Sequence, residues 1–267
     1  MSKEALRVIL IHGSCHGAWC WYKLLAELQS KGYNSVTAID LAASGADSRR
    51  IPEDVRTFKD YNRPLMEFMS TVPDGEKVIL VGHSFGGLSL AFAMDAFPEK
   101  IAAAIFVNAL LPDTLHQPFY FIDQQLQQLS NRKIELEIKP VVITGKSEPF
   151  LTACFDSNVL ATYVYQNCSF EDLSLASMML RPTLNFSEDL SNCSPFTKEG
   201  FGSVDKICII CNEDALIKED FVRWMIQNNG NVKETIEIEG ADHMPMLSKP
   251  RELCQLLASI VDIYSIL

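Results

Sequence analysis

A serine in the segment Gly82-His-Ser-Phe-Gly-Gly87 is the residue best placed to act as a nucleophile. The segment follows an apolar run typical of a strand and opens a run typical of a helix, a setting in which a sharp turn exposes a serine hydroxyl. Such a turn strains the serine backbone, and glycines two positions away let the chain fold back on itself. The helix that follows directs free N–H groups at the turn, which favours negative charge there. We therefore predict that Ser84 is a nucleophile.

A serine hydroxyl needs a base that takes its proton and later returns it to the leaving group. The chain has five histidines, and His243 fits best because it lies in a loop directly after the last expected strand. His83 adjoins the serine and is expected to pack on the other side of the turn. His12 and His16 flank an earlier loop, and His116 is expected at the surface. His243 is the predicted base.

A carboxylate must hold the imidazole in the correct tautomer and stabilise its charge. Asp214 lies just beyond an expected buried strand, after the serine and before the histidine, which is the order that this type of site requires. Glu213 should face the opposite way, and Asp220 belongs to the next helix. Asp242 is too close in sequence to reach its neighbour's ring. We predict that Asp214 is the orienting acid.

Two hydrogen-bond donors are needed for the oxyanion of an acyl-transfer reaction, and one such donor is worth about 3–4 kcal/mol. Backbone amides commonly supply them. One should be the amide of Phe85, which follows the nucleophile, and the other an amide of the loop after the first strand. Ser14 is our choice for that second amide.

The surrounding pattern alternates strands and helices, which predicts a doubly wound, mostly parallel sheet. Short β-branched runs read as buried strands, with the last more alternating and edge-like; they are Leu6–Ile11, Lys77–Val81, Ile101–Val107, Lys206–Cys211 and Glu234–Glu239. Apolar residues at three- and four-residue spacing predict helices; these are Trp21–Lys31, Tyr61–Ser70, Leu88–Phe97, Glu219–Asn228 and Arg251–Tyr264.

Residues 112–199 interrupt this alternation. They hold a glutamine-rich helical stretch and an alternating run, Arg132–Lys139, that indicates an exposed strand. The stretch is far longer than the dozen or so residues that a crossover needs. We predict a cap at 112–199, inserted into a sheet domain made of residues 1–111 and 200–267; the alternative is a set of ordinary crossover connections.

Charge and composition exclude some classes of function. The formal charge of −11 makes attraction to nucleic acid or to an anionic membrane surface unexpected. No apolar run reaches the roughly 18 residues that cross a bilayer. Eight cysteines follow a polar start, so we expect a reducing, cytoplasmic compartment. Cys208 and Cys211 lie within an apolar strand, where period-2 geometry favours buried packing over a redox or metal pair.

Five segments together resemble the plant methylesterase and hydroxynitrile lyase family of α/β-hydrolases, and the resemblance covers essentially the whole chain. They are His12-Gly-Ser-Cys-His-Gly-Ala-Trp19, Asp40-Leu-Ala-Ala-Ser-Gly45, Gly82-His-Ser-Phe-Gly-Gly87, Asn212-Glu-Asp214 and Gly240-Ala-Asp-His-Met244. Parts of the cap, Tyr165–Leu173 and Arg181-Pro182, are also similar to family segments. The form of the serine motif and the Ser48–Ile51 region most resemble the alkaloid methyl esterases of the family.

This resemblance implies a serine carboxylesterase that hydrolyses the methyl ester of a small plant metabolite, most of all an indole alkaloid, with no cofactor and no metal. A freed β-keto or β-formyl acid would be prone to lose CO₂. Methyl salicylate or methyl jasmonate is the alternative substrate. A lyase, a cyclase or a non-catalytic receptor on the same fold is the other alternative. The lyases place a threonine where this chain has Gly13 and a lysine where it has Met244.

An apolar pocket is expected between Ser84 and the cap. From position and resemblance, its predicted substrate contacts are Gly13, Trp19, Phe121, Met178, Leu216 and Met244. Such a pocket selects by shape, so the sequence leaves the substrate open. The expected partner is a small methyl ester, and a homodimer is left open.

Overall fold

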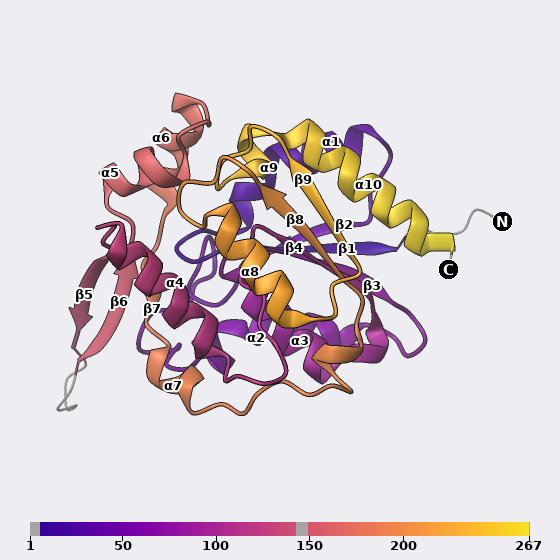
Figure 1. Ribbon diagram of the computed structural model, residues 1–267, viewed down its shortest axis with the longest axis horizontal. Helices are drawn as coiled ribbons and strands as arrows, with labels where there is room; N and C mark the ends of the chain where they lie inside the picture. Colours follow the sequence, from indigo (N-terminus) through magenta and orange to yellow (C-terminus); the bar gives the residue numbers. More distant parts are fainter. Residues whose placement is uncertain (1–5, 143–148, 267) are drawn as a thin grey trace.

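A six-stranded sheet forms the centre of the computed structural model, which describes residues 6–142 and 149–266. Its strands run in the order β2-β1-β3-β4-β8-β9, and every neighbouring pair is parallel (Figure 1). The strands are β1 (Arg7–Ile11), β2 (Val36–Ile39), β3 (Val78–His83), β4 (Ile101–Val107), β8 (Lys206–Cys211) and β9 (Glu234–Ile238). The predicted doubly wound α/β sheet is therefore confirmed.

Most strands could be predicted from the sequence because they are buried. All residues of β3 and β8 are buried, because helices cover both faces of a parallel sheet, and such strands read as continuous apolar runs. The edge strand β9 is largely exposed, as its alternating pattern indicated. Strand β2, the other edge, is not predicted from the sequence, because its four residues, three half-buried and one exposed, offer neither a long apolar run nor alternation.

Helices flank the sheet, with α1 packed on α10 and α2 packed on α3 (Figure 1). The core helices are α1 (Tyr22–Ser30), α2 (Phe58–Thr71), α3 (Gly86–Ala96), α8 (Glu219–Asn229), α9 (Pro245–Ser248) and α10 (Pro250–Ile266), with short 3-10 turns at Ala18–Trp21, Pro98–Lys100 and Phe201–Ser203. Helix α2 begins three residues before its predicted start because Thr57 and Asp60 form a reciprocal cap around its first turn.

The topology places a crevice at the carboxyl ends of β1 and β3. From β1 the chain moves to β2 on one side, whereas β3 and β4 follow on the other side, so the winding direction reverses between β1 and β3. Loops that leave neighbouring strands at such a reversal diverge and open a site for ligands. The loop after β1 holds Gly13 and Ser14, and the turn after β3 holds Ser84.

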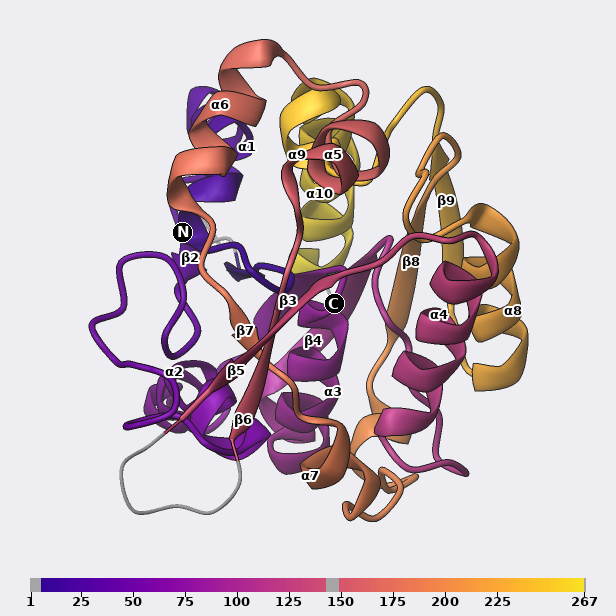
Figure 2. The same cartoon turned by 90° about the vertical axis from the view of Figure 1, so that its left-hand side faces the viewer.

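The segment between β4 and β8 forms a second layer over that end of the sheet (Figure 2). It contains a three-stranded antiparallel sheet and several helices. These elements are α4 (Phe119–Asn131), β5 (Glu137–Val141), β6 (Phe150–Cys154), α5 (Ser157–Val159), a π-helical turn at Leu160–Val164, α6 (Phe170–Met179), β7 (Thr183–Leu184) and α7 (Ser187–Ser191). We call this segment the cap; its boundaries at 112 and 199 stay a prediction.

The exposed strand predicted at Arg132–Lys139 exists but begins later. Helix α4 continues to Asn131, and Lys133 adopts a left-handed conformation at the end of that helix. Strand β5 therefore starts at Glu137, and four of its five residues are exposed. The sequence pattern identified the strand correctly and placed its start wrongly.

Two further findings concern the chain as a whole. Among the described residues, no helix is long and apolar enough to span a membrane. All eight cysteines are free thiols, and Cys208 and Cys211 are buried in β8 as predicted. The polar start of the chain, residues 1–5, lies outside the described residues.

Candidate active site

Ser84 occupies the sharp turn between β3 and α3. Its φ is +53°, the left-handed region that non-glycine residues rarely adopt. The turn is tight because the backbones are close: a Cβ on Gly86 would lie 2.6 Å from the carbonyl oxygen of His12, at the end of β1. Glycine at this position therefore lets α3 start directly against β1, with Ser84 raised at its N-terminal end.

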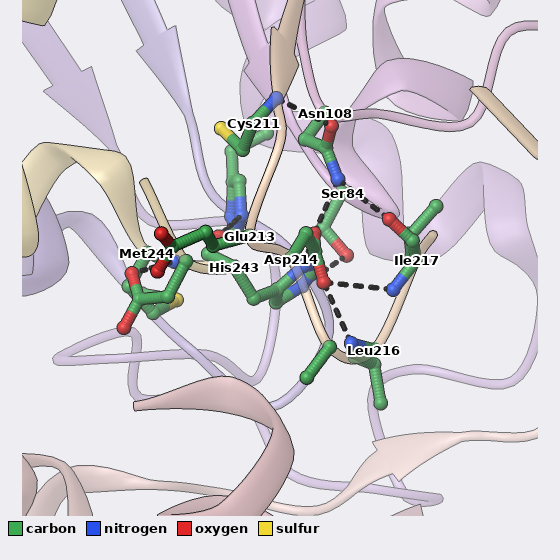
Figure 3. Close-up of polar contacts among 12 residues, drawn as sticks. Ser84, Asn108, Cys211, Glu213, Asp214, Leu216, Ile217, His243 and Met244 are labelled. Carbon is green, nitrogen blue, oxygen red and sulfur yellow. Dashed lines mark hydrogen bonds and ion pairs between the residues drawn. The ribbon is translucent and has the colours of Figure 1, made fainter. Parts of the chain in front are cut away.

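The side chain of His243 lies against Ser84. Its Nε2 is 3.1 Å from Ser84 Oγ, and its Nδ1 is 2.6 Å from Asp214 Oδ2 (Figure 3). A carboxylate only accepts hydrogen bonds, so Nδ1 carries the proton and Nε2 presents its lone pair to the serine hydroxyl. The structure thus brings together the three residues predicted as nucleophile, base and acid, with all three buried.

Asp214 is held by backbone amides as well as by the histidine. Its Oδ1 accepts hydrogen bonds from the amides of Leu216 at 2.7 Å and Ile217 at 2.8 Å, in the loop after β8. These bonds fix the plane of the carboxylate, because both amides hold the same oxygen. The imidazole of His243 therefore faces an Asp214 carboxylate of fixed orientation.

Asn108 is a residue of the site that the sequence analysis missed. Its amide nitrogen donates to Asp214 Oδ2 and, at 3.0 Å, to the carbonyl oxygen of Ile217 (Figure 3). Its Oδ1 accepts from the amide of Cys211 at 3.0 Å. Asn108 is fully buried and directly follows β4. Its sequence signal is a polar residue directly after a buried strand.

The two predicted oxyanion donors flank Ser84. Ser14 and Phe85 line the same cavity as Ser84, and within the described chain neither amide donates a hydrogen bond. Gly13 lies close behind the nucleophile, where an added Cβ would come within 2.9 Å of Ser84 Cβ. The Phe85 amide also belongs to the N-terminal end of α3, whose dipole favours an anion. The geometry suits a transient negative charge beside Ser84.

His83 and His12 form hydrogen bonds with the backbone of loops near the site. His83 donates from Nε2 to the carbonyl oxygen of His243 at 2.6 Å, and burial lowers its pKa well below the ordinary value. His12 donates from Nδ1 to the Gly13 carbonyl oxygen, and its Nε2 accepts from the amide of Leu41. Burial lowers the pKa of His12 as well, so both rings are neutral. Neither ring makes a hydrogen bond with Ser84 among the described residues.

The rejected acids and His116 also lie away from the base. Glu213 accepts from the side chain of Asn167 in the cap. Asp220 lies in the first turn of α8. Asp242 is buried and binds the amide of Met244 rather than the ring of His243. His116 is half-exposed and pairs with Asp113.

Two adjoining cavities lie between Ser84 and the cap. One has a volume of about 100 Å³ and is lined by Ser84, and the other has a volume of about 140 Å³ and extends toward α7. Their shared walls are Ser14, Phe85, Ile122, Leu126, Leu136 and Phe155. No Asp, Glu, Lys, Arg or His lines either one among the described residues, so the site is shaped for uncharged, apolar groups.

The predicted substrate contacts divide into two groups. Leu216 lines the cavity that holds Ser84, and Gly13 adjoins Ser84 itself. The remaining four line neither cavity: Trp19 stacks on His16, Phe121 packs on Trp224, Met244 is fully buried, and Met178 is 77% exposed on α6. Met178 is therefore placed wrongly as a substrate contact, because α6 turns it to solvent.

Within residues 6–142 and 149–266, there is no cluster of three or more His, Cys, Asp or Glu side chains that could hold a metal ion.

Comparison with known proteins agrees with this geometry. The α/β hydrolase family profile matches residues 8–256. Salicylic acid-binding protein 2 of Nicotiana tabacum is 47% identical, over 98% of this chain and 100% of that protein. Methylesterase 3 of Arabidopsis thaliana is 44% identical, over 99% of this chain and 100% of that protein.

Solved structures of similar proteins share the fold of this chain. The crystal structure of polyneuridine aldehyde esterase superimposes with a TM-score of 0.90 at 40% identity, covering 96% of this chain and 99% of that one. The family profile, the near-complete coverage of the relatives and the shared fold agree. The chain therefore belongs to the α/β hydrolase family, and within it to the methylesterases.

Proposed function

We propose that this protein is a serine carboxylesterase that hydrolyses the methyl ester of a small, largely apolar metabolite. The observation that carries the proposal is the continuous set of contacts from Ser84 Oγ through His243 to Asp214, at the floor of an uncharged cavity. The fold alone would not suffice, because the same fold serves many activities.

In the proposed reaction, His243 Nε2 takes the proton of Ser84 as Oγ attacks the ester carbonyl carbon. The amides of Ser14 and Phe85 bind the resulting oxyanion, and Asp214 stabilises the imidazolium. His243 then gives its proton to the departing methoxide, so methanol leaves and an acyl ester remains on Ser84. Water attacks this ester with the same base, which releases the carboxylic acid and restores the serine.

The acyl group should be bound by apolar contact. Hydrocarbon side chains make up most of the cavity walls, and none of the described lining residues is a carboxylate that could pair with a protonated amine. An alkaloid methyl ester remains our first candidate, supported by the similarity to polyneuridine aldehyde esterase. It would bind through its ring faces, and a β-formyl or β-keto acid product would then be prone to lose CO₂.

A hormone-type ester is the second candidate. The uncharged walls suit methyl salicylate and methyl jasmonate, and the relative from tobacco is named for salicylic acid. Cyanohydrin cleavage is less well supported. At Gly13 an added side chain would crowd Ser84, and the residue after the base is the buried Met244 rather than a lysine.

The test is turnover of a panel of esters by the wild type and by Ser84→Ala. The panel contains an indole-alkaloid methyl ester, methyl salicylate, methyl jasmonate and, for the lyase alternative, mandelonitrile. We expect methanol release from at least one ester by the wild type and none above background by the variant. Equal turnover by both proteins would refute the role of Ser84, and tight binding without product would favour a receptor.

A further inference from the structure

We propose that the cap segment Tyr165–Cys168 positions the catalytic loops, so that the cap completes the active site rather than only covering it. The loops concerned are residues 12–16, here called the oxyanion loop, and residues 240–244, here called the base loop. The inference rests on the proposed function, because it concerns the orientation of groups whose catalytic roles are themselves proposed.

Tyr165 reaches the oxyanion loop through His16. The His16 Nδ1 lies 2.9 Å from the carbonyl oxygen of Ser14, and its Nε2 lies 2.8 Å from the Tyr165 hydroxyl. Burial lowers the pKa of His16 to about 3, so the ring is neutral and carries one N–H. A carbonyl oxygen can only accept, so Nδ1 donates to Ser14 and Nε2 accepts from Tyr165. Each bond therefore has one direction.

Ring stacking also holds His16 in place, independently of its hydrogen bond with the Tyr165 hydroxyl. His16 stacks on Trp19 at a centroid distance of 5.5 Å and on Tyr165 at 5.9 Å. Tyr165 is 2% exposed. Removal of its hydroxyl alone should therefore preserve the packing and remove only the hydrogen bond.

Other cap residues hold the next part of the oxyanion loop. The amide of Cys15 donates to Thr183 Oγ1 at 2.6 Å. The carbonyl oxygen of Cys15 accepts from the amide of Arg181 at 3.0 Å. Cys15 has a φ of +65°, so this turn is held in a conformation that a cysteine rarely adopts. The adjacent amide of Ser14 is the proposed oxyanion donor, and its direction depends on this turn.

The base loop is joined to the same cap segment through Asp242. This fully buried carboxylate accepts from the amide of Met244 at 2.9 Å and from Ser248 Oγ at 2.6 Å. Its second oxygen accepts from the amide of Asn167 at 3.0 Å and from Cys168 Sγ at 3.3 Å. Asp242 thus connects the residue after His243 with the cap.

The size of the expected effect follows from geometry. A reacting or stabilising group displaced by about 1 Å can cost roughly 100-fold in rate. Loss of the Tyr165 hydrogen bond leaves the stack and the Cys15 contacts in place, so the displacement should be smaller. We expect a loss of about tenfold.

The experiment measures the second-order rate at which a fluorophosphonate inactivates the enzyme, because this probe needs the nucleophile, the base and the oxyanion donors but no known substrate. The variant is Tyr165→Phe, and the matched control is Tyr163→Phe, from the adjoining π-helical turn of the cap, whose hydroxyl makes no hydrogen bond with a described residue. Thermal melting checks that both variants are folded. Asp242→Asn, whose amide nitrogen cannot accept a hydrogen bond, tests the base-loop arm in the same assay.

The proposal expects Tyr165→Phe and Asp242→Asn to react about tenfold more slowly than the wild type, and Tyr163→Phe to react at the wild-type rate. With an ester substrate, Tyr165→Phe should lower kcat while KM stays nearly constant. Wild-type reactivity in both test variants would overturn the inference, as would a raised KM at unchanged kcat. A wild type that is not labelled at Ser84 would instead refute the proposed function.

Discussion

At Asp214, every acceptor position of a buried carboxylate is used. Two backbone amides, the ring of His243 and the side chain of Asn108 all donate to it. A charge in this setting is stable only while these donors remain, because an unpaired buried carboxylate is strongly disfavoured. The chemistry proposed for Ser84 therefore depends on residues that never meet the substrate.

Asn108→Ala tests this dependence. The change removes a donor to Asp214 and leaves the amide of Cys211 and the carbonyl oxygen of Ile217 without their partner. Each unsatisfied buried group costs about 1–3 kcal/mol, so the free energy of unfolding should fall by a few kcal/mol. We expect kcat/KM to fall by about tenfold or more, since a misplaced acid misplaces the base.

Steady-state kinetics and thermal melting measure both effects. Asn192→Ala is the control, because Asn192 is exposed and its side chain donates to the carbonyl oxygen of Glu188 in α7. An Asn108→Ala variant with unchanged kcat/KM would show that the backbone amides alone orient Asp214.

Cys154 offers a second test at the residue scale. It lines the cavity beside Cys15, and the neighbouring Cys15 thiol lowers the pKa of the Cys154 thiol to about 7. Burial instead raises the pKa of Cys193, which is also partly exposed. We expect N-ethylmaleimide to modify Cys154 first, at a rate that rises steeply up to pH 7 and levels off above it, because the thiolate is the reactive form.

Peptide mapping of the maleimide adducts at pH values from about 5.5 to 9 measures the rate of modification of each cysteine. A bound ester or product acid should slow the modification of Cys154, because it fills the cavity that this residue lines. Modification of Cys193 before Cys154 would contradict the assigned environment of the two thiols.

How far the sequence predicts individual residues depends on whether their partners are local. Ser84, His243 and Asp214 are recognisable because a motif and the ends of strands place them. Asn108 is not, because its partners become neighbours only when β4 pairs with β8. Met178 was misplaced because the direction of a side chain on α6 depends on how the whole cap packs.

At the scale of elements, the turn between β3 and α3 is the feature that the sequence predicted best. Its glycines are required by backbone approach, which a local motif encodes. Strand β2 was missed because its four residues have no strong periodic pattern. The start of β5 was misplaced because the alternating run also covers residues between the end of α4 and the strand. Pairing with β1 and with β6 defines these two strands, and pairing is a tertiary event.

Gly86→Ala tests the importance of this close approach. The added Cβ would lie 2.6 Å from the His12 carbonyl oxygen and 2.8 Å from that of Ile11, and backbone atoms cannot move aside cheaply. We expect a loss of about 1–3 kcal/mol in stability, as for overpacked sites, together with slower labelling of Ser84 as α3 shifts. Thermal melting and fluorophosphonate labelling measure the two effects.

The control is Gly202→Ala, where the nearest atom to an added Cβ is 3.3 Å away. A Gly86→Ala variant as stable and as reactive as that control would show that the turn tolerates a side chain.

At the scale of the molecule, partly buried polar contacts join the cap to the core at more than one place. Asp172 of α6 binds Tyr22 and Lys23 of α1. The guanidinium group of Arg181 donates to carbonyl oxygens in the loop 45–49. The sequence predicted an inserted cap but not these contacts, because they join positions more than a hundred residues apart.

Arg181→Ala should therefore destabilise the whole molecule and not only the cap. Loss of a charged donor to three carbonyl oxygens should cost about 1.5–3 kcal/mol. For a chain of this size the melting temperature should fall by about 2–4 °C per kcal/mol. Differential scanning calorimetry should show one transition for both proteins. A separate early transition would indicate a cap that unfolds independently.

The central claim is that Ser84, activated by His243, forms a covalent intermediate with an ester-like substrate. Peptide-mapped mass spectrometry after reaction with a fluorophosphonate tests it most directly. We predict a single adduct, on Ser84, in the wild type, and no adduct there in Ser84→Ala or His243→Ala. An adduct on another residue, or labelling of His243→Ala at the wild-type rate, would contradict the account.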